Sequence, residues 1–198
     1  MNAIVRVLRN WRYARKCVKV GKGCSFLGNH IEIEGHVEMG HYCRIRDYAR
    51  MRTYKGGKII FGNRCIVSWN AIIESGQLVE IHDHAGIGER ASVRDGSHLI
   101  YGTPEIWRYV PYIYKPVIIG EGAWIGSGAY VSPGVKIGKG AVLGVLSVAT
   151  KDIPDYEIWG GVPARFIRHR LKDLPPEIEA EAARLLAEQP LRKDRREW

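Results

Sequence analysis

Apolar side chains return at every sixth position through the central part of the chain. A helix repeats near 3.6 residues and a strand near 2, so this period predicts a polygonal coil that buries one aliphatic side chain on each side. Three such sides make one coil of about eighteen residues. Between residues 119 and 149 the repeated positions, most of them followed directly by glycine, are Ile119, Ile125, Val131, Ile137, Leu143 and Ala149.

A second series of small side chains follows the aliphatic positions at a fixed offset, as tight corners beside a narrow interior require. These residues are Ala123, Ala129, Val135, Ala141 and Ser147. The aliphatic register continues upstream at Leu27, Ile33, Met39, Ile45 and Met51, then at Phe61, Val67 and Ile73, and then at Ile81, Ile87 and Val93. The pattern therefore predicts an all-β solenoid over residues 20–154, in which each coil stacks on its neighbours.

The repeat is interrupted between Leu99 and Val117, where the spacer is too long for a turn. We predict an inserted loop at about 99–117, and loops on a rigid scaffold often carry function. Its aromatic residues could stack on sugar rings or clamp an adjacent subunit, and both interpretations stay open. These residues are Trp107, Tyr109, Tyr112 and Tyr114.

The repeat is followed by a segment without the six-residue period. Residues 155–198 are expected to form a C-terminal cap and a helix that opens at Pro175-Pro176 and runs through Gln189. The apolar residues Ile178, Leu185 and Leu186 of this helix would pack across the end of the coil or against another subunit.

Residues 1–19 are predicted to form a basic helical arm. The formal net charge of +9 is concentrated here, since the arm has no acidic residue and contains Arg6, Arg9, Arg12, Arg15, Lys16 and Lys19. This helix would cap the open end of the solenoid or lie on an anionic membrane surface. Nucleic acid is a less favoured partner, because no binding motif accompanies the charge. The arm lacks a cleavage site and a spanning run, so we expect a cytoplasmic protein, with the inner face of the membrane as the alternative location.

Three cysteines, Cys24, Cys43 and Cys65, fall on the small corner position of their repeats. A thiol packs there as a compact apolar group, so we expect buried, reduced side chains. The spacing fits neither a structural zinc site nor a disulfide framework.

The chain from roughly residue 60 to residue 170 closely resembles the hexapeptide-repeat acyltransferases. The resemblance is carried by VIIGEGAWIGSGAYVSPGVKIGKG at 117–140, TKDIP at 150–154 and GVPARFIR at 161–168. The branch is that of the galactoside, maltose, virginiamycin and polysaccharide O-acetyltransferases. The resemblance implies a left-handed parallel β-helix, a homotrimer with each site between two solenoids, and acetyl-CoA as co-substrate, with no permanently bound cofactor.

The same resemblance identifies His98 as the catalytic base. An alcohol must lose its proton as it attacks a thioester, and a neutral imidazole can accept that proton. The alternative is a loop histidine without a catalytic task. Backbone amides near Gly126 and Ser127 would stabilise the developing oxyanion.

Coenzyme contacts are implied for seven residues: Trp124, Ser127, Val145, Thr150, Lys151, Arg165 and Arg168. Arginine suits the phosphates of coenzyme A because its guanidinium binds them bidentately. Trp124 could instead fill a subunit interface, and the arginines could form a solvated edge. Asn70 is a candidate for the sugar or glycan acceptor, with a buried polar ladder residue as the alternative.

Two other functions compete with an O-acetyltransferase. A γ-class carbonic anhydrase would bind zinc through three histidines, for which His82, His84 and His98 are the candidates, but their spacing argues against a metal site. A non-catalytic solenoid scaffold would leave His98 and the arginines without a role. We favour direct acetyl transfer from acetyl-CoA to a sugar or polysaccharide hydroxyl.

Overall fold

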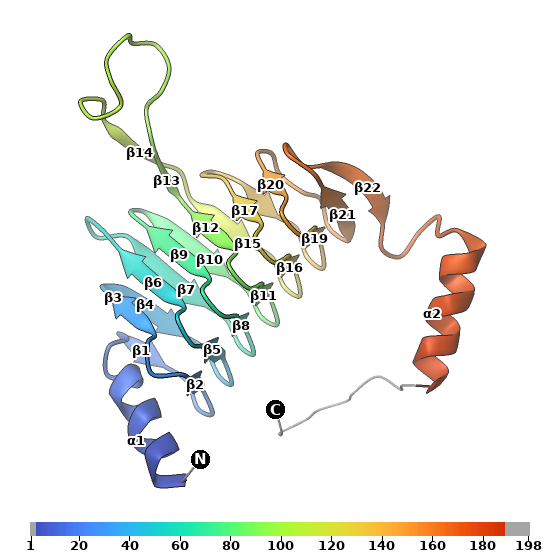
Figure 1. Cartoon of the computed structure of the whole chain (residues 1–198), viewed down its shortest axis with the longest axis horizontal. Helices are drawn as coiled ribbons and strands as arrows, with labels where there is room; N and C mark the ends of the chain where they lie inside the picture. Colours follow the sequence, from blue (N-terminus) through green and yellow to red (C-terminus); the bar gives the residue numbers. More distant parts are fainter. Residues whose placement is uncertain (1–2, 189–198) are drawn as a thin grey trace.

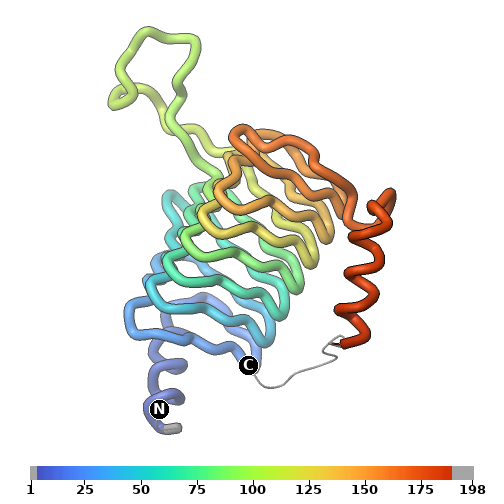
Figure 2. The backbone as a smooth tube through the Cα atoms, turned by 45° about the vertical axis from the view of Figure 1, so that its right-hand side comes forward, coloured from blue at the N-terminus to red at the C-terminus, as the bar shows by residue number. Residues whose placement is uncertain are grey.

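The computed structural model describes residues 3–188, and most of them wind into a stack of coils (Figures 1 and 2). Each coil contributes one strand to each of three sheets, in the order A, B, C. Within residues 3–188, sheet A contains β1 (Lys19–Val20), β4 (His36–Met39), β7 (Lys58–Phe61), β10 (Leu78–Ile81), β15 (Val117–Ile119) and β18 (Lys136–Ile137). Sheet B contains β2 (Ser25–Leu27), β5 (Arg44–Arg46), β8 (Ile66–Val67), β11 (Gly86–Ile87), β16 (Trp124–Ile125), β19 (Val142–Leu143), β21 (Glu157–Gly160) and β22 (Arg165–His169).

Sheet C contains β3 (Glu32–Glu34), β6 (Arg50–Thr53), β9 (Ile72–Ser75), β12 (Ser92–Arg94), β17 (Tyr130–Val131) and β20 (Val148–Ala149). A separate hairpin joins β13 (Gly96–His98) to β14 (Tyr112–Tyr114). Neighbouring strands of sheets A, B and C are parallel, except that β22 pairs antiparallel with β21. Three corners, A–B, B–C and C–A, connect the sheets and are named in that way below. The predicted solenoid with an inserted loop and helices at both ends is confirmed.

The core follows the six-residue period. From Ile119 to Ala149 every predicted aliphatic position is buried, and so are the small corner residues from Ala123 to Ser147. The prediction for Leu27 is wrong, because Phe26 occupies the core position of that coil. Phe26 pairs in register with the buried Ile45, which places Leu27 beside Arg46 on the outer face.

The corner cysteines stack along the A–B corner. The Sγ atoms of Cys24, Cys43 and Cys65 each donate a hydrogen bond of 3.1 Å to a carbonyl of the next coil. Cys43 and Cys65 are buried as expected, whereas Cys24, in the first coil, is only half-buried. Burial and the neighbouring Cys24 raise the pKa of Cys17 to about 12. A hydrogen bond to Cys43, together with burial, raises the pKa of Cys24.

These thiols are expected to react slowly with iodoacetamide in the native protein. With a pKa of about 12, Cys17 would be a thiolate in about one molecule in 10⁴ at about pH 8, and the thiolate is the nucleophile. Intact-mass measurement should show little alkylation of the native chain and full alkylation in guanidinium chloride. Equal rates under both conditions would contradict the buried environment.

The two terminal helices meet the solenoid differently. Helix α1 (Ala3–Ala14) caps the first coil through Tyr13, whose ring lies 5.5 Å from that of Phe26 and whose hydroxyl accepts a hydrogen bond from Ile31 N at 3.3 Å. Helix α2 (Pro176–Glu188) has no buried residue, so its expected packing across the coil end is wrong for the isolated chain. The predicted end of this helix at Gln189, like the rest of the expected C-terminal segment beyond residue 188, lies outside the described residues. Neither helix combines the length and apolar content needed to cross a bilayer within residues 3–188.

Candidate functional site

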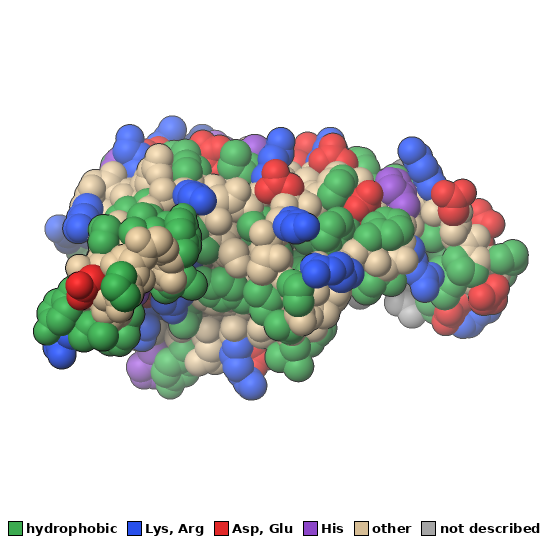
Figure 3. Space-filling model, turned by 90° about the horizontal axis from the view of Figure 1, so that it is seen from above, with side chains coloured by type: hydrophobic (Ala, Val, Ile, Leu, Met, Phe, Trp, Pro, Cys, Tyr) green, Lys and Arg blue, Asp and Glu red, His purple; other side chains and the backbone are tan. Residues whose placement is uncertain are grey.

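The inserted segment leaves the solenoid at the C–A corner, directly after β12, and projects from it as a hairpin and a long loop (Figures 1 and 2). Exposed apolar side chains gather over this loop (Figure 3), and those of its tip are Ile100, Tyr101, Ile106, Trp107 and Tyr109. The antiparallel pairing of Gly96 with Tyr114 and of His98 with Tyr112 holds the root of the hairpin together.

Asp95 anchors this root to the preceding coil. Its side chain is buried and accepts hydrogen bonds from the Ser75 hydroxyl and from the backbone N–H groups of Gly76, Gln77 and Leu78, all at 2.7–2.8 Å. Its backbone carbonyl accepts a further bond of 2.7 Å from the N–H of Lys115 at the far end of the insertion. One carboxylate thus fixes both the corner and the position from which the hairpin starts.

Two glycines make room for the aromatic residues of β14. A Cβ atom on Gly76 would overlap the ring of Tyr114, and one on Gly96 would overlap the ring of Tyr112. The Tyr112 and Tyr114 rings lie 5.0 Å apart. Burial raises the pKa of both phenols, so they stay neutral and pack as aromatic surfaces.

His98 lies in an aromatic setting at the start of the loop. Its ring makes edge contacts with Trp107, at a centroid distance of 5.1 Å, and with Tyr112, at 4.8 Å. The Nδ1 atom is buried and has no hydrogen-bond partner within residues 3–188. A histidine that accepts a proton at Nε2 must carry its own proton on Nδ1, and a hydrogen-bond acceptor at Nδ1 fixes that tautomer. Such an acceptor would come from a group outside the described residues.

Trp124 and Arg168 share one register row on the outer face of sheet B. Trp124 pairs with Val142, Val142 with Ile158, and Ile158 with Arg168. Three strand spacings separate the ends of this row, which is roughly 14 Å. Trp124 is 56% exposed, so the structure leaves its indole open to a ligand or another subunit.

Ser127 and Val145 follow the same strands and stack at the B–C corner. The N–H of Leu146 donates to the carbonyl of Ser127 at 2.9 Å, and the side chains of Ser127 and Val145 are exposed. The N–H of Gly126 already donates to Leu143 O at 2.8 Å, so it cannot serve as the expected oxyanion donor. The N–H of Ser127 donates no hydrogen bond within residues 3–188 and remains the candidate.

Thr150 and Lys151 lie at the opposite edge of sheet C. They follow β20 at the C–A corner, where the Lys136 N–H donates to Asp152 Oδ1 at 2.8 Å, and both are exposed. Arg165, at the start of β22, is exposed and donates from its guanidinium to the adjacent Ala164 carbonyl at 3.0 Å. The candidate coenzyme residues therefore divide between sheet B with its B–C corner and the C–A corner, from which the His98 hairpin also departs.

Asn70 is a corner residue at the B–C edge. Its backbone has φ = 57°, a left-handed conformation that asparagine tolerates better than most residues. The side chain is exposed, so the alternative of a buried ladder residue is wrong. A shallow hollow beside Asn70 is lined by His30, Glu32, Tyr48, Arg50 and Ile72.

His82 and His84 lie at the A–B corner, away from the C–A corner that carries His98. Between them, Asp83 accepts hydrogen bonds from Asn63 N at 2.8 Å and from Asn63 Nδ2 at 3.0 Å, which lower the pKa of the Asp83 carboxyl. Asp83 thus links the A–B corners of two neighbouring coils. Across residues 3–188, no group of three or more histidine, cysteine or acidic side chains is arranged to hold a metal ion.

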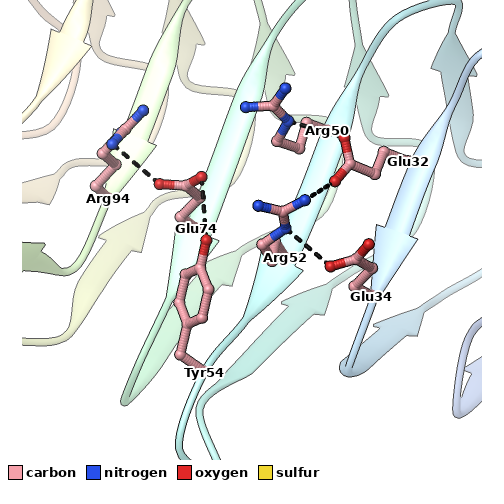
Figure 4. Close-up of polar contacts among 7 residues, drawn as sticks. All are labelled: Glu32, Glu34, Arg50, Arg52, Tyr54, Glu74 and Arg94. Atoms are coloured by element: carbon pink, nitrogen blue, oxygen red, sulfur yellow. Dashed lines mark hydrogen bonds and ion pairs between the residues drawn. The ribbon is translucent and has the colours of Figure 1, made fainter.

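A ladder of ion pairs covers the outer face of sheet C (Figure 4). Glu32 accepts from Arg50 at 2.9 Å and also from Arg52, and Arg94 pairs with Glu74 at 3.0 Å. Sequence reasoning missed this ladder and the anchoring role of Asp95. The signal for the ladder was present, because acidic and basic residues about one coil apart must face each other across parallel strands.

Comparison with known proteins supports the fold. Residues 116–148, which include Trp124, Ser127 and Val145, match the family model described as bacterial transferase hexapeptide (six repeats). No significant match to a curated protein was found.

Solved structures cover most of the chain. AntD, an N-acyltransferase from Bacillus cereus in complex with dTDP and 3-hydroxybutyryl-CoA, has a TM-score of 0.71 and 22% identity over 91% of this chain and 96% of its own. Galactoside acetyltransferase in complex with coenzyme A has a TM-score of 0.62 and 23% identity over 86% and 74%. A hexapeptide-repeat acetyltransferase from Vibrio cholerae has a TM-score of 0.54 and 21% identity over 83% and 81%. At these identities the likeness establishes the solenoid fold that the chain shares with these proteins.

Proposed function

We propose that the protein is an acyl-CoA-dependent acyltransferase that moves an acetyl group from acetyl-CoA to a hydroxyl of a sugar or polysaccharide precursor. The observation that carries the proposal is the position of His98. It stands on an anchored hairpin that leaves the solenoid directly before the hexapeptide segment 116–148. A single imidazole beside an acyl thioester is sufficient for general-base catalysis of direct transfer.

The donor would lie along the row from Trp124 to Arg168. This row of roughly 14 Å offers an exposed indole at one end and a guanidinium at the other, which suits a long ligand with an uncharged arm and anionic phosphates. Ser127 and Val145 border the row, Arg165 adds a positive charge at the start of β22, and Lys151 adds one at the C–A corner. The solved galactoside acetyltransferase, which has the same fold, contains coenzyme A.

A complete site would form between copies of the chain in a homotrimer. The His98 hairpin leaves the C–A corner, whereas Trp124, Ser127 and Arg168 belong to sheet B and the B–C corner. These two corners lie at opposite edges of sheet C, so the C–A corner of one copy would have to meet the B–C corner of its neighbour. The unpartnered Nδ1 of His98 supports this arrangement, because a neighbouring chain could supply the missing acceptor.

In the reaction, Nε2 of neutral His98 accepts the proton of the acceptor hydroxyl while its oxygen attacks the thioester carbonyl. The Ser127 N–H donates to the oxyanion that forms, and the carbon–sulfur bond then breaks as the carbonyl is restored. Protonated His98 returns the proton to the departing coenzyme A thiolate. No covalent acyl-enzyme is needed.

An amino sugar is the second candidate acceptor. The solved AntD structures belong to an N-acyltransferase, and one contains dTDP-4-amino-4,6-dideoxyglucose together with coenzyme A. A panel of hydroxyl and amino saccharides, assayed for coenzyme A release, tests the donor and the acceptor together. Release with a hydroxyl acceptor supports O-acetylation, release with an amino acceptor alone reassigns the reaction, and failure to bind acetyl-CoA supports the scaffold alternative.

Arg168→Ala should raise the KM for acetyl-CoA by about 10- to 100-fold and change kcat less, because one charge-assisted hydrogen bond to a phosphate contributes about 1.5–3 kcal/mol. Steady-state kinetics at saturating acceptor measure both constants. The matched control is Arg184→Ala, which removes an exposed arginine of α2 paired with Glu188. Equal KM values for wild type and Arg168→Ala would reject the phosphate contact.

A further inference from the structure

Helix α1 presents an apolar stripe that faces away from the solenoid. Ile4, Val7, Leu8 and Trp11 recur at the i, i+3, i+4, i+7 spacing of one helix face and are 58–65% exposed. Tyr13, which packs on the first coil, lies on the opposite side of the helix. The capping contact therefore accounts for one face of α1 and leaves the apolar stripe uncovered.

At 100° per residue, Arg12 flanks this stripe and Arg15 lies at its C-terminal end, and no acidic residue lies in the part of the sequence that contains α1. The first acidic residue of the chain is Glu32, and the residues before it include Arg6, Arg9, Arg12, Arg15, Lys16, Lys19 and Lys22. The Arg15 guanidinium lies 4.6 Å from the centroid of the Trp11 ring, at the edge of the stripe. An indole flanked by cations on an amphipathic helix suits the interface between acyl chains and anionic headgroups.

Other occupants fit these features less well. A second copy of α1 would bring the same positive charges together, and nucleic acid would match the charges but not the exposed aliphatic residues. Since α1 is too short and too charged to span a bilayer, its stripe can enter only the boundary region of one leaflet.

We propose that α1 is an interfacial helix that docks the protein on an anionic lipid bilayer. The apolar stripe enters the headgroup boundary, and the arginine and lysine side chains contact lipid phosphates. Figure 1 shows α1 at one end of the solenoid and β22 with α2 at the other, so docking leaves the donor row on β16, β19, β21 and β22 accessible. This inference does not depend on the acyltransferase activity.

Co-sedimentation of the full chain with vesicles tests the proposal. Binding is expected with phosphatidylglycerol vesicles, and not with phosphatidylcholine vesicles, and it should weaken with added salt. The double variant Leu8→Gln/Trp11→Gln keeps good helix formers and the full charge, and it should lose at least about tenfold in affinity. The control Leu171→Gln changes an aliphatic residue that is 65% exposed beyond β22 and should bind like wild type.

Three results would overturn the proposal. Wild-type affinity of Leu8→Gln/Trp11→Gln would show that the stripe does not enter the bilayer. The stripe would instead contact a second copy of the chain if wild type formed oligomers without lipid and did not bind vesicles, and if these oligomers were lost in Leu8→Gln/Trp11→Gln. Binding to duplex DNA in place of vesicles would assign the charge to nucleic acid. Circular dichroism of each variant verifies that the solenoid remains folded.

Discussion

His98→Ala is expected to lower kcat for acetyl transfer to a hydroxyl by about 10²–10⁴-fold, the usual contribution of a general base. The affinity for acetyl-CoA should remain within a few-fold of wild type, because His98 lies on the hairpin and is not one of the candidate coenzyme residues, which lie on sheet B and at the B–C and C–A corners. Turnover from coenzyme A release and affinity from calorimetry measure the two effects separately.

The control for this variant is His84→Ala, which removes an exposed histidine of the A–B corner. It should retain wild-type turnover. An amine is partly deprotonated near neutral pH without enzymatic help, so transfer to an amino sugar should depend less on His98 than transfer to a hydroxyl. Unimpaired hydroxyl transfer by His98→Ala would remove this residue from the mechanism.

Asp95→Ala is expected to lower the free energy of unfolding by about 3–5 kcal/mol. The variant leaves one hydroxyl and three backbone N–H groups without their acceptor at a buried corner, and each unsatisfied donor costs about 1–3 kcal/mol unless water reaches it. Turnover should also fall, because the carboxylate fixes the root of the hairpin that carries His98. Urea unfolding monitored by circular dichroism measures the free energy of unfolding.

Asp152→Ala is the matched control at the same C–A corner. Asp152 is exposed and accepts a hydrogen bond from Lys136 N, so its loss should cost about 1 kcal/mol or less. Similar destabilisation by the two variants would contradict the anchoring role assigned to Asp95.

The architecture could be predicted because the six-residue period is a direct consequence of the coil. Ile119, Ile125 and Val131 are the buried last residues of β15, β16 and β17, one on each side of the triangle, so a fixed spacing along the chain corresponds to a fixed position on successive sides. At Leu27 this reasoning failed, because an altered corner shifted the register by one residue and a shift of one exchanges the inner and outer faces.

The site was less predictable, because its geometry depends on contacts between coils. Nothing local to Asp95 shows that its carboxylate meets Gly76, Gln77 and Leu78 of the previous coil. Backbone hydrogen bonding is also invisible in the sequence, which is why the occupied amide of Gly126 was expected to be available. The sequence pattern of α2 identifies an amphipathic helix but not whether its partner belongs to the same chain.

A structure of the protein bound to coenzyme A tests the central claim most directly. We predict that the pantetheine arm lies along the row from Trp124 to Arg168 of one copy, with the thiol next to His98 of a neighbouring copy and within reach of the Ser127 N–H. Coenzyme bound on another face, or His98 pointing away from the thiol in every copy, would contradict it.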